Sequence, residues 1–164
     1  MSHFKKIKDP INKFKKGYQR NNPNLLKHLE SKLINGEPFH YLFTGKVGCG
    51  KTYLARHIMY YSSTRWEYIK VYKFYQEYLG IIGSNAYDKF DALRSHSQPM
   101  QSESLLIDDL GNEKPSTEAA HDYFGGLIER RYDYLERKAD ISRTIITTNL
   151  NGDQIQKTYG SRVL

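Results

Sequence analysis

Residues 45–52 read GKVGCGKT, and they follow the apolar run FHYLFT at residues 39–44. The apolar run predicts a short buried strand. After the loop, apolar residues recur at helical spacing and predict a helix over residues 51–63. A glycine-rich loop between a strand and a helix fits the phosphate-binding pattern G-x-x-x-x-G-K-[ST], whose four fixed positions are here Gly45, Gly50, Lys51 and Thr52.

The residue types of this loop predict its chemistry. Glycines at positions 45, 48 and 50 let backbone N–H groups turn toward one anion, and the N-terminus of the next helix adds partial positive charge. We expect Lys51 to reach the β- and γ-phosphates and the Thr52 hydroxyl to bind Mg²⁺. The alternative is an accidental glycine turn, which the strand before the loop and the helix after it make less plausible. The predicted nucleotide-contacting residues are Gly45, Lys46, Val47, Gly48, Cys49, Gly50, Lys51, Thr52 and Tyr53.

Two other predicted strands end in polar side chains that suit the same site. The stretch SLLIDDLG at residues 104–111 carries Asp108 and Asp109, and RTIITTNL at residues 143–150 carries Asn149. Ligands of open α/β sheets bind at the carboxyl ends of the strands. We therefore expect Asp108 to bind Mg²⁺, and Asp109 to orient or deprotonate an attacking water. Asn149 can hydrogen-bond the γ-phosphate or that water. A cap or turn after a strand would explain one aspartate, but not both beside a phosphate loop. Asn149 taken alone is more often part of a turn, and it gains weight only as the third such residue.

Strands and helices alternate along the chain. Strands are predicted at residues 39–45, 66–74, 104–111 and 143–150. Helices are predicted at residues 23–35, 51–63, 75–82 and 116–138 and from residue 151 onward, with a polar connection at 83–103 that holds one short helix. The alternation predicts a parallel sheet with helices on both faces. Together with the glycine-rich loop it predicts an α/β P-loop NTPase fold.

The length and the net charge of the chain indicate its domain organisation and the kind of partner it suits. The chain has 164 residues, enough for one domain, and its 25 Lys and Arg against 18 Asp and Glu give a net charge of +7. A basic arm at residues 1–21 precedes a predicted core at residues 22–164, and such an arm suits a polyanionic partner. The alternative is a solubilising tail.

The sequence also predicts the compartment of the protein. There is no apolar run long enough for a membrane span, no secretory signal and only one cysteine, Cys49, so we expect a cytoplasmic protein.

The motifs, taken in order, resemble one family. GKVGCGKT, SLLIDDLGNEKPS, ERRYDYLERK, RTIITTNLN and YGSRVL are similar to the AAA+ ATPases of the DnaC/DnaI helicase-loader and IstB transposition-helper group, from about residue 38 to the last residue. The resemblance implies that residues 45–52 are the Walker A motif, Asp108 and Asp109 the Walker B motif, and Asn149 sensor 1. It also implies that Arg162 is an arginine finger that reaches the nucleotide of a neighbouring subunit. The chain ends at Leu164, before the fifth strand and the helical lid of that group.

The resemblance implies a function in DNA replication. We expect an ATPase with ATP and Mg²⁺ as cofactors, weakly active without the lid, that forms a homo-oligomer when ATP is bound. It would act as a loader of a replicative helicase on single-stranded DNA. Three alternatives remain open: a transposition helper that acts with a transposase on duplex DNA, a nucleotide-dependent binding module with little hydrolysis, and a small P-loop kinase.

A DNA-contacting surface is predicted after the second strand, together with the basic arm. Cations and aromatic rings alternate there, so that rings could stack on bases while cations follow the phosphates. The alternative is that most of these rings belong to the core. The residues are Lys73, Phe74, Tyr75, Tyr78, Lys89, Phe90 and Arg94.

Overall fold

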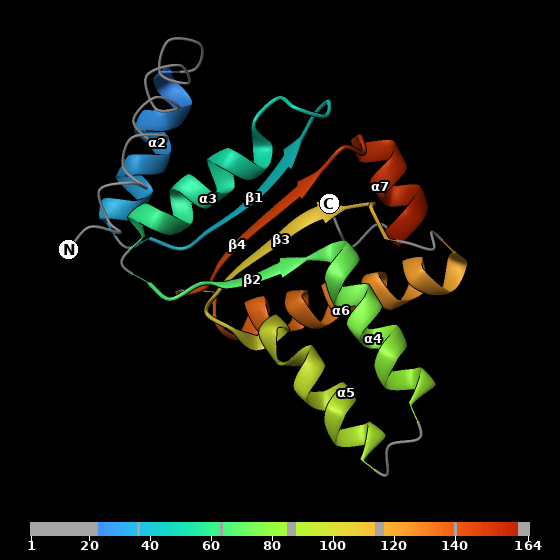
Figure 1. Cartoon of the computed structure of the whole chain (residues 1–164). Helices are drawn as coiled ribbons and strands as arrows, with labels where there is room; N and C mark the ends of the chain where they lie inside the picture. Colours follow the sequence, from blue (N-terminus) through green and yellow to red (C-terminus); the bar gives the residue numbers. More distant parts are fainter. Residues whose placement is uncertain are drawn as a thin grey trace, which may run out of the picture.

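The fold is built on a parallel sheet with the strand order β1-β4-β3-β2 (Figure 1). The computed structural model describes residues 23–35, 37–62, 64–84, 88–113, 117–139 and 141–160. Neighbouring strands are parallel throughout, so all of them end at the same edge of the sheet. The strands are β1 (Phe39–Thr44), β2 (Glu67–Lys70), β3 (Ser104–Leu110) and β4 (Arg143–Thr148). The described sheet confirms the predicted α/β P-loop NTPase architecture.

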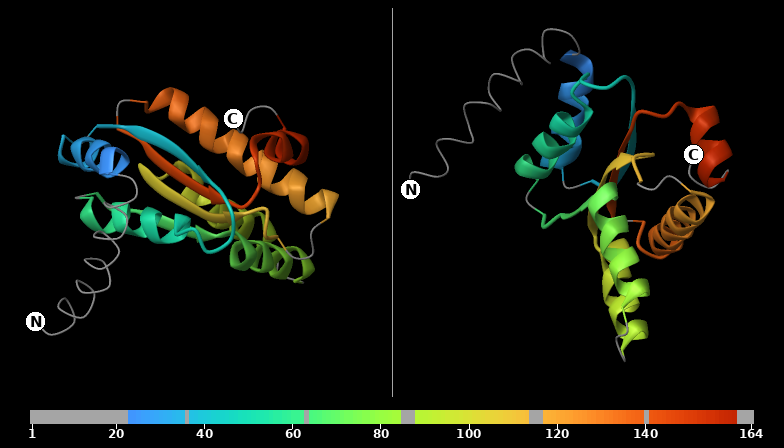
Figure 2. Two further views of the ribbon diagram at one scale, coloured as in Figure 1. Left: turned by 90° about the horizontal axis from the view of Figure 1, so that it is seen from above. Right: turned by 45° about the vertical axis from the view of Figure 1, so that its right-hand side comes forward.

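Helices cover both faces of this sheet, as Figure 2 shows in its right-hand view. Side chains of β3 alternate between two hydrophobic clusters, because successive residues of a strand point to opposite faces. Leu106 packs with α2 and α3, whereas Leu105 and Ile107 pack with the helices of the other face. The helices are α2 (Pro23–Ile34), α3 (Lys51–Tyr61), α4 (Val71–Gly83), α5 (Lys89–Ser97), the 3-10 turn η1 (Gln98–Gln101), α6 (Glu118–Arg137) and α7 (Gly152–Tyr159).

The predicted strand at residues 66–74 is too long. Strand β2 ends at Lys70 and helix α4 begins at Val71. Its buried residues Val71, Phe74 and Tyr75 have the spacing of one helical face, not the alternation of a strand. Aromatic and β-branched residues favour strands, but here the spacing of the buried side chains outweighs that preference.

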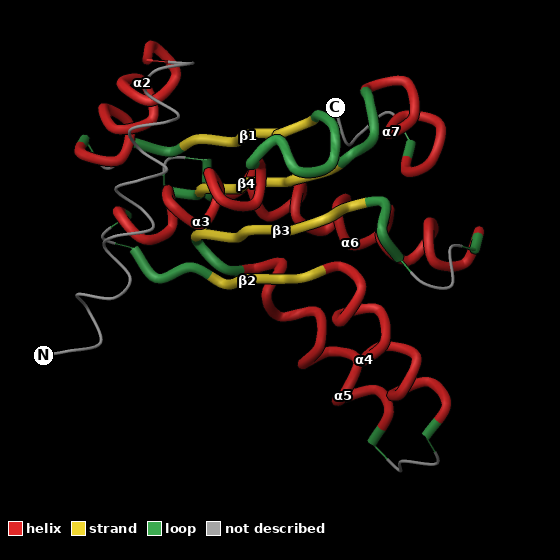
Figure 3. The backbone as a smooth tube through the Cα atoms, turned by 45° about the horizontal axis from the view of Figure 1, so that its top comes forward, coloured by secondary structure: helices red, strands yellow, loops and turns green. Residues whose placement is uncertain are grey.

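Most aromatic rings of the predicted DNA surface pack within the protein instead. Phe74 and Tyr75 are buried in the core, and the Tyr78 ring stacks on Tyr123 with centroids 3.9 Å apart. These rings cannot stack on bases while they pack in the protein. Of the four aromatic residues in that prediction only Phe90 is largely free, with 79% of its surface exposed. It lies on α5, and Figure 3 shows α4 and α5 extending together beyond the β2 edge. The basic arm lies outside the described residues.

The buried side chain of Arg131 joins α6 to the starts of β3 and β4. Its guanidinium donates to the Thr144 hydroxyl at 3.0 Å and to the carbonyl oxygens of Arg143 at 2.9 Å, Met100 at 3.1 Å and Ser102. Burial lowers the pKa of Arg131 to about 10, so the group remains charged at neutral pH. Arg131 therefore fixes α6 against the edge of the sheet that lies opposite the phosphate loop.

The described helices contain no segment that is both long and apolar enough to cross a membrane.

Candidate functional site

The loop between β1 and α3 has an anion-binding conformation. Gly45, Gly48 and Gly50 have φ values of 144°, 79° and 93°, which residues with a side chain rarely adopt. Gly50 is the N-cap of α3 and provides no side-chain acceptor, so the first N–H groups of this helix are not capped by the side chain of their N-cap residue. These donors are available to a phosphate, and the positive end of the helix dipole favours one.

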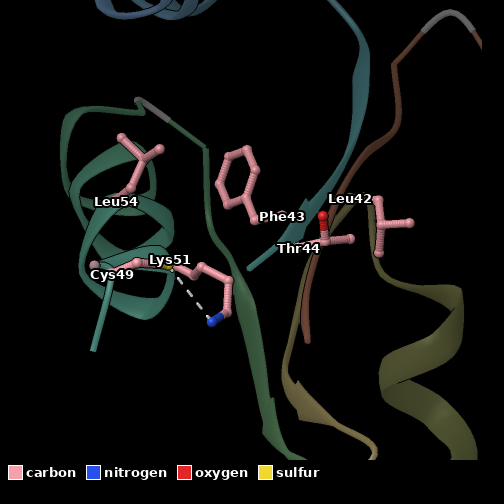
Figure 4. A pocket seen from close by; sticks show the side chains of 7 residues that line it. Leu42, Phe43, Thr44, Cys49, Lys51 and Leu54 are labelled. Carbon is pink, nitrogen blue, oxygen red and sulfur yellow. Dashed lines mark hydrogen bonds between the residues drawn. The ribbon is translucent and has the colours of Figure 1, made fainter. Parts of the chain in front are cut away.

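Lys51 lies across this loop and joins it to the end of β4. Its ammonium donates to the carbonyl oxygens of Gly45 at 2.7 Å and Lys46 at 3.0 Å, and to the side-chain oxygen of Asn149 at 2.8 Å. Figure 4 shows the same ammonium beside Cys49, whose sulfur is 3.7 Å away. The structure thus brings together two predicted site residues, Lys51 and Asn149, from distant parts of the chain.

Asp108 lies at the end of β3 with 1% of its surface exposed. Its Oδ1 accepts hydrogen bonds from the hydroxyls of Thr52 and Thr147, each at 2.7 Å. The two predicted metal ligands, Thr52 and Asp108, are therefore in direct contact. Both supply oxygen atoms, which are the ligands that Mg²⁺ prefers.

A β-bulge interrupts the pairing of β3 with β4 at the two aspartates. Ile107 pairs with Ile146 and Leu110 pairs with Thr148, so two residues of β3, Asp108 and Asp109, lie opposite one residue of β4, Thr147. The Thr147 hydroxyl, besides its bond to Asp108, accepts a hydrogen bond from the Asp109 N–H at 2.9 Å. The sequence alone predicts no role for Thr147, because threonine is common at the ends of strands.

The bulge also gives Asp109 an unusual backbone. Its φ is 65°, the only positive value among the described residues other than glycine. Aspartate and asparagine tolerate this region better than most residues. The carboxylate is partly exposed, and it lies 3.9 Å from the ammonium of Lys70 at the end of β2. Lys70 is a site residue that the sequence did not reveal, because the segment around it resembled an uninterrupted strand.

A model of the ATPase family associated with various cellular activities (AAA) matches residues 41–162. The chain belongs to the AAA family. The matched segment begins in β1 and includes the glycine loop, the two aspartates and Asn149. Membership of an ATP-binding family agrees with the observed P-loop NTPase core. A comparison with curated proteins finds no match to this chain.

The residues at the carboxyl ends of the strands, here called the AAA site, include groups suited to the phosphates and to the Mg²⁺ of a magnesium nucleotide. The glycine loop and Lys51 offer N–H groups and positive charge to phosphates, and Thr52 and Asp108 offer oxygen atoms to Mg²⁺. The described residues contain no group of three or more His, Cys, Asp or Glu side chains that could hold a metal ion.

A pocket of about 270 Å³ lies beside the loop, between the end of β1 and the start of α3. Figure 4 shows side chains from both elements around it. Its lining combines apolar and polar groups from Leu42, Phe43, Thr44, Cys49, Gly50, Lys51 and Leu54.

The remaining predicted residues are less constrained. Lys46 and Val47 lie in the exposed part of the loop, and Tyr53 lies in the first turn of α3. Arg162 lies outside the described residues.

The AAA site also includes Tyr68 of β2 and Arg56 of α3, which sequence patterns did not reveal. The Tyr68 hydroxyl donates to the second oxygen of Asp108 and accepts from Arg56, each at 2.8 Å.

Proposed function

We propose that this AAA protein binds ATP with Mg²⁺ at the carboxyl edge of its sheet and hydrolyses it. The observation that carries the proposal is the convergence of Lys51, the Thr52–Asp108 pair and Asn149, which come from the start of α3 and the ends of β3 and β4. Lys51 would bind the β- and γ-phosphates, replacing its present bonds to loop carbonyls. Thr52 and Asp108 would hold Mg²⁺, which supplies positive charge that stabilises the phosphates during transfer.

Asp109 and Asn149 are the proposed catalytic residues of this site. Asp109 is partly exposed and is held by the bulge at the edge where the phosphates would bind. It would orient or deprotonate the attacking water. Asn149 is uncharged, so it can contact a γ-phosphate without repelling it.

The proposed cellular role is that of a helicase loader-like ATPase on single-stranded DNA. The resemblance of the motifs to the DnaC/DnaI group and the net charge of +7 support it. From the predicted DNA surface, the exposed ring of Phe90 and the exposed side chain of Arg94 lie on the same helix, α5. The proposed partners are single-stranded DNA and a replicative helicase. An IstB-like role would instead require duplex DNA and a transposase.

Size measurements with nucleotide and DNA test this role. We expect the protein to form a larger assembly with a non-hydrolysable ATP analogue, and single-stranded oligonucleotide to bind to that assembly. Preference for duplex over single-stranded oligonucleotide would favour the transposition helper. Absence of DNA binding in either nucleotide state would contradict both roles.

Mixing two inactive variants tests whether subunits share a site. Lys51→Ala subunits keep Arg162 but lack a working nucleotide site, and Arg162→Ala subunits have the reverse defect. If Arg162 acts on a neighbouring subunit, the mixture recovers part of the ATPase activity. No recovery would mean that Arg162 acts within its own subunit or has no catalytic role.

A binding module with little hydrolysis is the second candidate. The Lys70–Asp109 ion pair favours it, because a carboxylate that is held toward a cation is less free to turn toward an attacking water. Single-turnover ATP hydrolysis distinguishes the two candidates: a rate no higher than that of Asp109→Asn would favour the binding module.

A further inference from the structure

We infer that Tyr68 and Arg56 are positioning residues that hold the Asp108 carboxylate in one orientation for Mg²⁺. The inference rests on the proposed Mg²⁺–ATP site and deepens it. Neither residue belongs to the glycine loop or to the strand ends from which the site was predicted. Both act through hydrogen bonds that end on the buried oxygen Oδ2 of Asp108.

The direction of these hydrogen bonds follows from the chemistry of the side chains. A guanidinium has only donors, so the bond between Arg56 and the Tyr68 oxygen must run from Arg56 to Tyr68. The single hydroxyl proton of Tyr68 is then left for Asp108. The guanidinium also lies over the Tyr68 ring, 5.1 Å from its centroid, which limits how the ring can move.

Helix α3 and strand β2 place these groups on the same face of β3. Tyr68 pairs in register with Leu106, which shares its face of the sheet with Asp108 because the two residues are two positions apart. Arg56 lies one helical turn after Thr52, so α3 presents both side chains toward this face. Figure 3 shows α3 lying over the middle of the sheet. One helix therefore contacts Oδ1 directly through Thr52 and Oδ2 indirectly through Arg56 and Tyr68.

The arrangement has a consequence for metal binding. Thr52 and Thr147 bond Oδ1, and Tyr68 alone among the described residues bonds Oδ2. When the Thr52 hydroxyl turns to a metal ion, Asp108 loses one of its three partners. Tyr68 then keeps the carboxylate from rotating. Loss of a partner that orients a metal ligand typically weakens metal binding about tenfold to a hundredfold.

Tyr68→Phe removes the bond and keeps the ring. Tyr68 is 37% exposed, so loss of its hydroxyl should leave the fold intact, and thermal unfolding checks this. The matched control is Tyr132→Phe, the same change on α6 at a residue that is 47% exposed. The measurement is the affinity for a fluorescent ADP in EDTA and at a series of Mg²⁺ concentrations.

We expect the affinity in EDTA to be unchanged in both variants. The Mg²⁺ concentration that gives half of the gain in affinity should rise about tenfold in Tyr68→Phe and stay unchanged in Tyr132→Phe. Equal midpoints in the two variants would overturn the inference and leave the proposed function standing. No ADP binding by the wild-type protein, or no gain with Mg²⁺, would overturn the proposed function itself and with it this inference.

A double-mutant cycle tests whether Arg56 acts through Tyr68. Arg56→Gln changes an exposed helical residue, so it provides a second variant that should fold. If the relay exists, Arg56→Gln shifts the Mg²⁺ midpoint differently in the wild-type and Tyr68→Phe backgrounds. Equal shifts in the two backgrounds would mean that Arg56 acts on Asp108 by its charge alone, and would overturn its part in the inference.

Discussion

The ammonium of Lys51 and the side-chain oxygen of Asn149 lie 2.8 Å apart, although 98 positions separate the two residues in the sequence. The same ammonium also bonds two carbonyl oxygens of the glycine loop. The loop and the end of β4 therefore provide three oxygen acceptors for Lys51. In the proposed mechanism a nucleotide would compete with these bonds, and Asn149 would be free to contact it once Lys51 binds the phosphates.

Substitution of Asn149 should separate binding from catalysis. We predict that Asn149→Ala leaves ATP affinity unchanged or slightly tighter, because a competing partner of Lys51 is lost. Its hydrolysis rate should fall by about a hundredfold or more, as expected when a transition-state hydrogen bond is removed. Asn149→Asp is the informative comparison, since a carboxylate there would hold Lys51 and repel the γ-phosphate. Titration and single-turnover assays measure both quantities, and equal losses of affinity and rate in Asn149→Ala would contradict the assignment.

The backbone of Asp109 makes asparagine the right replacement. Asparagine tolerates the positive φ of 65°, so Asp109→Asn should keep the bulge, the fold and ATP binding. Hydrolysis should be lost, because an amide cannot accept the proton of an attacking water. Lys70→Met should raise the rate if the ion pair restrains Asp109. A variant Asp109→Asn that hydrolyses ATP at the wild-type rate would remove Asp109 from the mechanism.

Arg131 should matter for stability and not for catalysis. Arg131→Met leaves several buried oxygen acceptors without a donor, so we predict a loss of about 3 kcal/mol in the free energy of unfolding. Arg130→Met is the matched control, because the neighbouring Arg130 is exposed. Urea denaturation of both variants gives the comparison. Similar stabilities for the two would show that the buried hydrogen bonds of Arg131 contribute little.

Stability should fall as the pH drops below about 6.5, the usual pKa of histidine. Burial lowers the pKa of His96 in the folded protein, while the carbonyl of Phe74 and the carboxylate of Glu77 oppose this more weakly. Below pH 6.5 the unfolded chain therefore binds a proton that the folded chain excludes, so the free energy of unfolding decreases. Burial also lowers the pKa of His40, so this residue reduces the free energy of unfolding at low pH in the same way.

Denaturation of His96→Gln at pH 7.5 and 5.5 measures the contribution of His96. We expect the variant to lose less stability between these two pH values than the wild type, with the residual change due in part to His40. An unchanged pH dependence would mean that His96 does not titrate differently in the folded and unfolded states.

Much of the site could be predicted because each strand end carries its own local pattern. GKVGCGKT, the Asp108–Asp109 pair and Asn149 are short motifs, and the parallel sheet brings them to one edge. Tyr68, Lys70 and Thr147 could not be identified in this way. Their roles depend on the register between strands and on a bulge, and no local pattern encodes either feature.

The boundary between β2 and α4 shows a second limit of sequence patterns. Residues 66–74 contain the aromatic and β-branched residues typical of strands, yet the helix begins within them. The burial of Phe74 and Tyr75 depends on core residues from distant parts of the chain, and the local sequence does not encode these contacts. The same burial removed two aromatic rings from the predicted DNA surface.

The proposed function requires that the loop at residues 45–52 binds ATP through the charge of Lys51. Calorimetric titration of Mg²⁺–ATP into the wild type, Lys51→Ala and Lys46→Ala measures this contribution. Lys46→Ala removes the same charge from the same loop, but the observed contact of Lys46 is through its main chain. We predict an affinity loss of about a hundredfold in Lys51→Ala, since charge-assisted hydrogen bonds contribute about 3 kcal/mol, and little change in Lys46→Ala. Equal affinities for all three proteins, or no binding by the wild type, would contradict it.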